Sequence, residues 1–304
     1  MDVGIVIVNY NTYENTFKCI DSILEVCKLE YKIFVIDNRS TNDSVKRIND
    51  RYRDNKKIDL ITASENKGYS AGVNIGIKEA IKNKCNAIII SNNDIIYKQN
   101  SIEAMYEELE KNKSTAVVGP KIIDINDGIM PNLKGTLSYE KYIFSKKPLM
   151  YIDFMGINKK LYYKNYKYDK TIEVEGMVGG ACFMISNEFI KKIGYLDENI
   201  FLFFEEDTIA YKLKDTDLKV YLQPESEVIH FGSSTINKQE SSFALFHRYS
   251  SAMYVLKKYE KIGNFKLFLI FIINYMGLFL NFKDKTSRDY MNKLYKYYIQ
   301  LLSI

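Results

Sequence analysis

Three consecutive acidic residues, Glu205, Glu206 and Asp207, follow the apolar run 201–204. Adjacent carboxylates repel one another, and burial beside apolar side chains raises the pKa of a carboxyl group toward values that suit a general base. An acidic first helical turn, which complements the helix dipole, is the competing explanation for part of this cluster. The sequence therefore predicts one base among the three acids, with one or two of the others in a structural role.

A polar group also interrupts the apolar stretch 88–97, which reads IIISNNDIIY. Its four polar residues are either a plain turn or a binding site at the end of a buried strand. Hard divalent cations prefer oxygen ligands, and Asp94 is the only charged residue of the four. If this segment is a binding site, Asp94 is the one residue of the four that can supply charge to it.

Two further residues have chemistry suited to a nucleotide ligand. Asp37 ends a predicted buried strand, where a carboxylate can accept a hydrogen bond from a pyrimidine imide or a ribose hydroxyl. An Asx turn or helix cap is the alternative there, and Ser40 or Asn42 suits that role better. His230 closes the predicted strand 219–230, beside small residues that suit phosphate contact, and it is one of only two histidines.

These residues need a scaffold, and the first 120 residues alternate between apolar runs and helical patterns. The predicted strands are 4–10, 32–37, 58–63, 86–91 and 115–120, the last ended by Gly119-Pro120; the predicted helices are 14–28, 44–53, 71–82 and 101–111. Continuous apolar strands alternating with helices indicate a parallel sheet covered on both faces. Loops at the carboxyl ends of such strands form a binding crevice, which would bring together 9–11, 37–40 and 91–94.

The chain contains no GxGxxG and no P-loop motif, so dinucleotide and P-loop enzymes lose their main support. Instead it carries an ordered series: VNYNT (8–12), VIDNRSTNDS (35–44), ENKGYSAGVNIGI (65–77), SNND (91–94), FLFFEEDTIAYKLK (201–214) and VIHFGSS (228–234). Over residues 3–250 this series resembles the family 2 glycosyltransferases of the GT-A fold, particularly their rhamnosyltransferase-like branch in bacterial polysaccharide synthesis. The resemblance implies an α/β nucleotide-sugar-binding fold with a mainly parallel sheet in residues 1–250, comprising a nucleotide-binding half (1–120) and an acceptor half (121–250), and a helical C-terminal region in 251–304.

The resemblance also implies roles for individual residues. Matching the aromatic run and Lys212 makes Glu206 the base, whereas matching the literal Glu-Asp pair makes it Asp207. Asn92 replaces the first acid of the family's metal motif, and Thr208-Ile209 replaces a further acid. The implied ligands of a divalent cation (Mn²⁺ or Mg²⁺) are Asp94 and His230, and the implied acceptor loop contains Gly179 and Gly180. The implied donor contacts are Val8, Tyr10, Asp37, Asn38, Ser40, Asn66, Gly68, Asn74, Asn93 and Arg248.

By the same resemblance, the expected activity is inverting transfer from a nucleoside-diphosphate sugar, either dTDP-rhamnose-like or a UDP-sugar. The expected acceptor is a surface polysaccharide or a lipid-linked glycan. Two alternatives are a non-catalytic sugar-nucleotide-binding scaffold and a sugar-nucleotide pyrophosphorylase. The latter requires a glycine- and arginine-containing loop after the first strand, and VNYNT provides neither residue.

The C-terminal region accounts for the net positive charge of this 304-residue chain. The net charge is +5, which is too small to indicate a nucleic-acid partner, yet residues 257–304 contain nine Lys/Arg against three Asp/Glu. The apolar segment 267–280 is shorter than the roughly 20 residues that span a bilayer. Residues 257–288 are therefore either a core or homo-oligomer interface, or a peripheral membrane contact with basic flanks.

The start of the chain lacks signal-peptide features, so we expect a cytoplasmic protein, free or on the inner face of the membrane.

Overall fold

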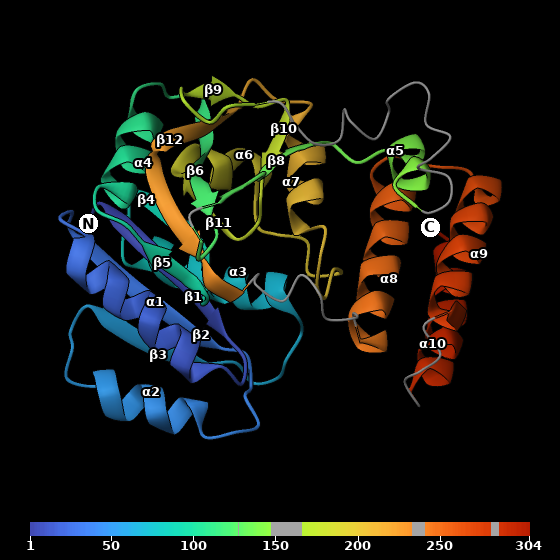
Figure 1. Cartoon of the computed structure of the whole chain (residues 1–304), viewed down its shortest axis with the longest axis horizontal. Helices are drawn as coiled ribbons and strands as arrows, with labels where there is room; N and C mark the ends of the chain where they lie inside the picture. Colours follow the sequence, from blue (N-terminus) through green and yellow to red (C-terminus); the bar gives the residue numbers. More distant parts are fainter. Residues whose placement is uncertain (127, 147–165, 233–240, 281–285) are drawn as a thin grey trace.

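The computed structural model describes residues 1–126, 128–146, 166–232, 241–280 and 286–304. Its centre is a mostly parallel sheet in the order β3-β2-β1-β4-β11-β6-β12-β5 (Figure 1). The strands are β1 (Val3–Asn9), β2 (Tyr31–Asp37), β3 (Ile58–Thr62), β4 (Ala87–Asn92), β5 (Ile95–Tyr97), β6 (Thr115–Ile123), β7 (Ile129–Met130), β8 (Leu133–Gly135), β9 (Ile172–Glu173), β10 (Gly176–Val178), β11 (Cys182–Ser186) and β12 (Lys219–His230). The helices are α1 (Tyr13–Val26), α2 (Ser44–Tyr52), α3 (Tyr69–Lys82), α4 (Ser101–Glu110), α5 (Tyr139–Phe144), α6 (Asn187–Ile193), α7 (Glu205–Leu213), α8 (Ser242–Lys258), α9 (Asn264–Leu280) and α10 (Ser287–Leu301).

Helices cover both faces of the sheet, as the continuous apolar strands predict. On one face, Ile5 and Ile7 of β1 pack in a core with residues of α1, α2 and α4. On the other, Val6 and Val8 pack in a core with α3, α6 and α7. Successive side chains of a strand point to opposite faces, so a strand buried on both sides must be apolar at every position.

The predicted end of the fifth strand at Gly119-Pro120 is wrong, because β6 continues to Ile123. Proline has no N–H to donate and is normally excluded from a central strand. Here the neighbouring strand β12 has a register shift between Gln223, which faces Pro120, and Glu227, which faces Lys121. The irregularity in β12 accommodates the proline, and a feature of the partner strand cannot be read from the local sequence.

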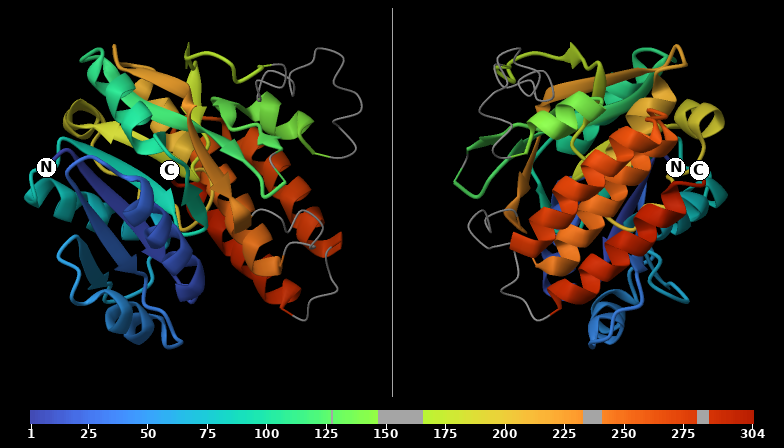
Figure 2. Two further views of the ribbon diagram at one scale, coloured as in Figure 1. Left: turned by 60° about the vertical axis from the view of Figure 1, so that its left-hand side comes forward. Right: turned by 90° about the vertical axis from the view of Figure 1, so that its right-hand side faces the viewer.

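Helices α8, α9 and α10 lie side by side at one side of the sheet (Figures 1 and 2). They share a core of their own with α5, which includes Leu256, Ile270 and Leu294. The predicted division between residues 250 and 251 falls within α8. Within the described ranges, none of the helices combines the length and the apolar character that a bilayer crossing requires.

Helix α8 is tied to the loop that precedes α7 through Asp197. The carboxylate of Asp197 accepts hydrogen bonds from the hydroxyls of Tyr254 (2.8 Å) and Tyr259 (2.7 Å) and from Lys258 Nζ (3.1 Å). Although burial opposes its charge, hydrogen bonds from Tyr259, Asn199 and Tyr254 hold the pKa of Asp197 well below its usual range. The C-terminal helices thereby help to fix the chain just before the acidic cluster.

Candidate active site

The ends of β1, β2 and β4 meet at one edge of the sheet. Asn9 pairs in register with Asp37, and Val8 pairs with Asn92. Side chains join the loops that follow, since Asn93 Nδ2 donates to Thr12 Oγ1 (2.8 Å). The structure thus brings together the three loops that the strand order predicted.

A cavity of about 520 Å³ opens between these loops and α8. Its lining includes one predicted metal ligand, Asp94, and six of the predicted donor contacts: Val8, Tyr10, Asn38, Asn66, Gly68 and Asn93. Gly68 has φ +97°, and a Cβ there would lie 2.3 Å from the carbonyl oxygen of Phe201. Only glycine fits this backbone conformation and close approach.

Asp37 and Ser40 support this cavity from behind, and neither of them lines it. Asp37 is fully buried. Its Oδ2 accepts from Asn9 Nδ2 (2.7 Å) and Ser40 Oγ (2.6 Å), and its Oδ1 accepts from the Ser40 amide (2.8 Å). Both carboxylate oxygens thus accept hydrogen bonds that anchor the loop, and the contact of Asp37 with a pyrimidine or a ribose hydroxyl stays a prediction.

Asn74 also lies away from the cavity that it was expected to line. It is buried in α3, where its side chain accepts from the Leu196 amide (2.9 Å) and donates to the Leu196 carbonyl (3.0 Å) and to Glu198 Oε1 (2.8 Å). These contacts hold the loop that leads into α7. The amide satisfies two backbone groups of that loop, and the predicted donor contact of Asn74 stays a prediction.

A second cavity, of about 320 Å³, adjoins the first and shares Tyr69, Asn92 and Leu202 with it. Glu205, Glu206, Gly180, His230 and Arg248 are among its lining residues. Arg248, a predicted donor contact, reaches it from α8 with its guanidinium 4.3 Å above the ring of Phe203. The acids, the histidine and the arginine thus share one cavity although the sequence separates them widely.

The three acids have different surroundings. Asp207 has a side chain only 1% exposed; its Oδ2 pairs with Lys134 Nζ (2.5 Å) and its Oδ1 accepts from the Leu137 amide (3.2 Å). Burial raises its pKa to about 6, against the opposing effect of Lys134. Asp207 lines neither of the two cavities, whereas Glu205 and Glu206 line the second.

Glu206 is the acid that faces the second cavity beside Gly180. Its Oε1 lies 3.3 Å from Lys134 Nζ, and a Cβ on Gly180 would lie 3.4 Å from its Oε2. Gly179 is not among the residues that line this cavity. Its amide donates to the Asn132 carbonyl (2.6 Å). Of the two predicted acceptor glycines, Gly180 is therefore the one beside a carboxylate.

Glu205 lines the same cavity, and its Oε1 is buried with no hydrogen-bond partner within the described structure. Burial, and then the charge of Glu206, raises its pKa to about 8. Two residues of this cavity, Lys134 and Tyr69, were not predicted from the sequence. Lys134 lies in a stretch with no periodic pattern, and the hydroxyl of Tyr69 had no sequence signal at all.

Asp94 and His230 lie together at the border of the two cavities. His230 Nε2 is 3.1 Å from Asp94 Oδ1, and a Cβ on Gly232 would lie 1.9 Å from Asp94 Oδ2. Neighbouring ligands of an octahedral ion with bonds of about 2.1 Å are about 3 Å apart, so this pair fits one Mg²⁺ or Mn²⁺. In the described parts of the chain no group of three or more His, Cys, Asp or Glu side chains could hold a metal.

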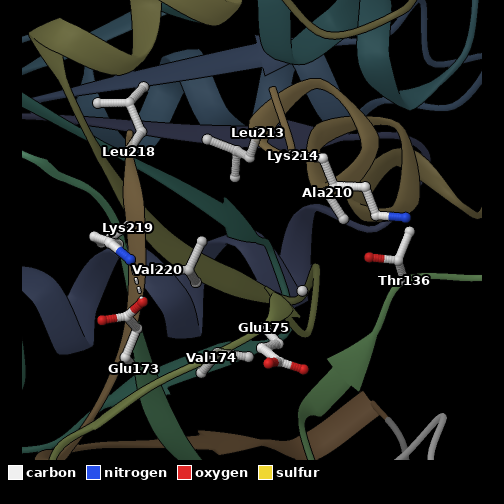
Figure 3. Close-up of a pocket in the computed structure, with 11 residues that line it drawn as sticks. Thr136, Glu173, Val174, Glu175, Ala210, Leu213, Lys214, Leu218, Lys219 and Val220 are labelled. Atoms are coloured by element: carbon white, nitrogen blue, oxygen red, sulfur yellow. Dashed lines mark hydrogen bonds and ion pairs between the residues drawn. The ribbon is translucent and has the colours of Figure 1, made fainter. Parts of the chain in front are cut away.

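A separate cavity of about 380 Å³ lies at the other end of α7 (Figure 3). It is lined by apolar residues such as Leu213 and Val220, and by the exposed ion pair of Lys219 with Glu173 (2.6 Å). None of the predicted site residues lines it. It is therefore distinct from the site at the strand ends.

Comparison with known proteins agrees with this geometry. The sequence model "Glycosyl transferase family 2" matches residues 4–194, more than half of the chain. The hexosyltransferase Agl10 of low-salt glycan biosynthesis in Haloferax volcanii is 23% identical over 81% of this chain and 72% of its own. The N-acetylglucosaminyl-diphospho-decaprenol L-rhamnosyltransferase of Mycobacterium tuberculosis is 20% identical over 84% of both chains, and the dTDP-rhamnosyl transferase RfbF of Shigella flexneri is 23% identical over 74% of this chain and 67% of its own.

Solved structures show the same fold. The structure of GalNAc-T7 with UDP, GalNAc and Mn²⁺ superposes with a TM-score of 0.60 at 16% identity over 84% of this chain, which spans half of that one. S. aureus TarS 1–349 with UDP gives a TM-score of 0.52 at 11% identity, over 94% of this chain and 73% of its own. The predicted α/β class with a GT-A arrangement is thereby confirmed. The chain belongs to glycosyl transferase family 2.

Proposed function

We propose that this glycosyltransferase is an inverting enzyme that moves a sugar from a nucleoside-diphosphate sugar to a hydroxyl of a surface polysaccharide or lipid-linked glycan. The observation that carries the proposal is the position of Glu206, which lines a cavity directly adjoining the one that six predicted donor contacts line. A carboxylate at that boundary is placed to remove a proton from an acceptor beside a donor. The relatives named for rhamnosyl and hexosyl transfer support the substrate class.

In the proposed reaction, Glu206 accepts the proton of the acceptor hydroxyl as the acceptor oxygen forms its bond to the anomeric carbon. The bond between that carbon and the diphosphate breaks on the opposite face, so the configuration inverts and the nucleoside diphosphate leaves with the bonding electrons. Lys134 Nζ lies 3.3 Å from Glu206 Oε1 and forms an ion pair with the carboxylate of the proposed base. The neighbouring Gly180 leaves room for the acceptor oxygen to approach Glu206.

Asp94 and His230 would hold a divalent cation, Mn²⁺ or Mg²⁺, next to the donor diphosphate. When bound, such a cation neutralises charge on the leaving diphosphate. Asp94 presents a carboxylate, and Gly232 leaves the space that its Oδ2 occupies. The Mn²⁺ in the GalNAc-T7 structure supports this part of the proposal.

For the donor, we propose dTDP-rhamnose or a UDP-sugar. The name of RfbF supports the first nucleotide, and the UDP in the GalNAc-T7 and TarS structures supports the second. The cavity that Tyr10 and Asn66 line would hold the nucleoside, with Asp37 and Ser40 fixing its wall. Arg248 would contribute positive charge from the adjoining cavity.

Residues 257–288 are proposed to contact the inner face of the membrane; 281–285 lie outside the described residues. Helix α9 contains a single charged residue, Lys266, and exposes large apolar side chains at helical spacing along one side: Phe265, Phe268, Ile272, Met276 and Phe279. With the basic residues of the region, this surface suits an anionic bilayer. Flotation with phosphatidylglycerol vesicles, lost in a Phe268→Glu variant, tests it; a stable dimer that Phe268→Glu dissociates would instead assign the surface to a second copy.

The activity is tested by nucleotide release from a panel of dTDP-, UDP- and GDP-sugars, with Mn²⁺ and with a chelator. We expect release from one nucleotide class, strongly reduced by the chelator. Binding of a sugar nucleotide without release from any donor would contradict catalysis and favour a sugar-nucleotide-binding scaffold.

A further inference from the structure

Two polar atoms in the second cavity have no partner among the described residues: the hydroxyl of Tyr69 and Oε1 of Glu205. Both atoms are buried. A buried polar atom without a hydrogen bond is unfavourable, and nearly all such atoms in folded proteins are paired. Two of them on one cavity wall indicate that a ligand supplies the missing partners.

The backbone fixes both side chains in place. Tyr69 begins α3, and its amide donates to the Phe201 carbonyl (2.8 Å). Glu205 begins α7 directly after Phe203 (φ 69°) and Phe204 (φ 68°), two bulky residues in the left-handed region. That conformation is unfavourable for such residues and is typical of functional sites. The two groups are therefore held toward the cavity by a strained turn and by the contact of Tyr69 with the chain that leads into it.

The ligand that suits this pair is uncharged and rich in hydroxyls. Burial raises the pKa of the Tyr69 hydroxyl well above its usual range, and the pKa of Glu205 is raised to about 8. Both groups are thus protonated at neutral pH and able to donate as well as accept. Neither group carries a charge in that state, and a sugar ring offers hydroxyls that can both donate to and accept from them.

We propose that the Tyr69 hydroxyl and the Glu205 carboxyl form the subsite that hydrogen-bonds the hydroxyls of the donor's sugar ring and so selects the sugar that is transferred. The assignment rests on the proposed function. The donor is favoured over the acceptor because Tyr69 lines both cavities, including the one assigned to the nucleotide. The three acids then have different proposed roles. Glu205 binds the sugar, Glu206 removes the proton of the acceptor hydroxyl, and Asp207 stabilises the fold.

Tyr69→Phe tests the subsite, because it removes one oxygen and leaves the ring. Titration calorimetry with dTDP-rhamnose, UDP-glucose, UDP-N-acetylglucosamine and GDP-mannose first identifies the sugar nucleotide that the wild type binds. We expect Tyr69→Phe to weaken binding of that sugar nucleotide about tenfold and to leave the affinity for the bare nucleoside diphosphate unchanged. Glu205→Leu should have the same effect.

A structural role would give a different result, which provides the control. Because the Tyr69 hydroxyl has no hydrogen-bond partner among the described residues, Tyr69→Phe should not lower the melting temperature. Tyr52→Phe, which breaks a 2.7 Å bond to Asp21 elsewhere, should lower it and leave both affinities unchanged. A melting temperature of Tyr69→Phe that falls as much as that of Tyr52→Phe, with sugar affinity kept, would overturn the inference.

The remaining outcomes distinguish a subsite for the donor's sugar from a subsite for the acceptor. If Tyr69→Phe and Glu205→Leu leave the donor affinity intact and raise the KM for the acceptor, the subsite belongs to the acceptor and the donor assignment is wrong. If the wild type binds sugar nucleotides and both variants keep its donor affinity and its KM for the acceptor, the proposed subsite is wrong while the proposed function stands. A wild type that binds neither sugar nucleotides nor nucleoside diphosphates would overturn the proposed function itself.

Discussion

Replacing Lys134 with methionine removes the cation that pairs with both Glu206 and Asp207. The side chains of Lys134 and Asp207 are 16% and 1% exposed, so this is a buried pair. Removing one partner leaves Asp207 buried with the Leu137 amide as its remaining donor among the described residues. Breaking buried pairs of this kind costs roughly 3–5 kcal/mol of unfolding free energy.

The decrease in unfolding free energy caused by Lys134→Met should depend on pH. The pKa of Asp207 in the folded protein is about 6, so its charge is paired above that pH and largely neutralised below it. Without Lys134 the pKa of Asp207 rises further, and the folded state is penalised as pH rises through this range. We expect the full loss at pH 8 and only a small one at pH 5, measured by urea unfolding followed by circular dichroism.

Lys219→Met is the matched control, because Lys219 and Glu173 form an exposed pair, 45% and 49% accessible (Figure 3). That pair should contribute less than about 1 kcal/mol at either pH. Lys134→Met combined with Asp207→Asn should recover most of the stability, since no buried charge remains. A loss at pH 8 no larger than that of Lys219→Met, or an equal loss at pH 5 and pH 8, would refute the reasoning.

Three further predictions address the other parts of the site. Gly232→Ala places a methyl group 1.9 Å from Asp94 Oδ2, so the Mn²⁺ concentration for half-maximal nucleotide release should rise at least tenfold. Gly68→Ala forces a side chain into φ +97° and 2.3 Å from the Phe201 carbonyl, so it should cost more than about 1 kcal/mol and weaken UDP or dTDP binding in calorimetry. The pKa of Glu205 is raised from 4.5 to about 8, so wild-type stability should fall as pH rises through that interval, and Glu205→Gln should flatten the dependence in unfolding measured at pH 6 and pH 8.5.

Gly263→Ala is the control for both glycine substitutions, because a Cβ there has nothing within 4 Å. It should leave stability and metal response unchanged. An unaltered Mn²⁺ response in Gly232→Ala would argue against a cation at Asp94. Wild-type stability in Gly68→Ala would show that the strained approach to Phe201 is not needed, and parallel pH curves for wild type and Glu205→Gln would show that Glu205 is ionised at neutral pH.

The sheet and its binding edge could be predicted from the sequence, because the information is local. Runs such as 4–10 and 32–37 have a continuous apolar centre, 5–8 and 33–36, and each ends in polar residues that parallel strands must bring to one edge. The error at Pro120 has the opposite cause. Its accommodation depends on the irregularity of β12 around Gln223, about a hundred residues later.

The different surroundings of the three acids could not be predicted either, because they too depend on residues far away in the sequence. The sequence places Glu205, Glu206 and Asp207 in a row and leaves the base open. Their burial is decided by distant residues, above all Lys134, which lies about seventy positions earlier in β8. The helical phase of α7 turns Asp207 toward this lysine and Glu206 toward the cavity, a distinction that a motif alone does not contain.

The central claim, that Glu206 is the base, is tested most directly by comparing Glu206→Gln with Asp207→Asn. With the sugar nucleotide that the wild type uses, kcat and donor affinity are measured for both variants. We predict that Glu206→Gln loses at least about a hundredfold in kcat with unchanged donor affinity, and that Asp207→Asn, where folded, keeps substantial turnover. Normal turnover in Glu206→Gln together with an inactive but folded Asp207→Asn would contradict the claim.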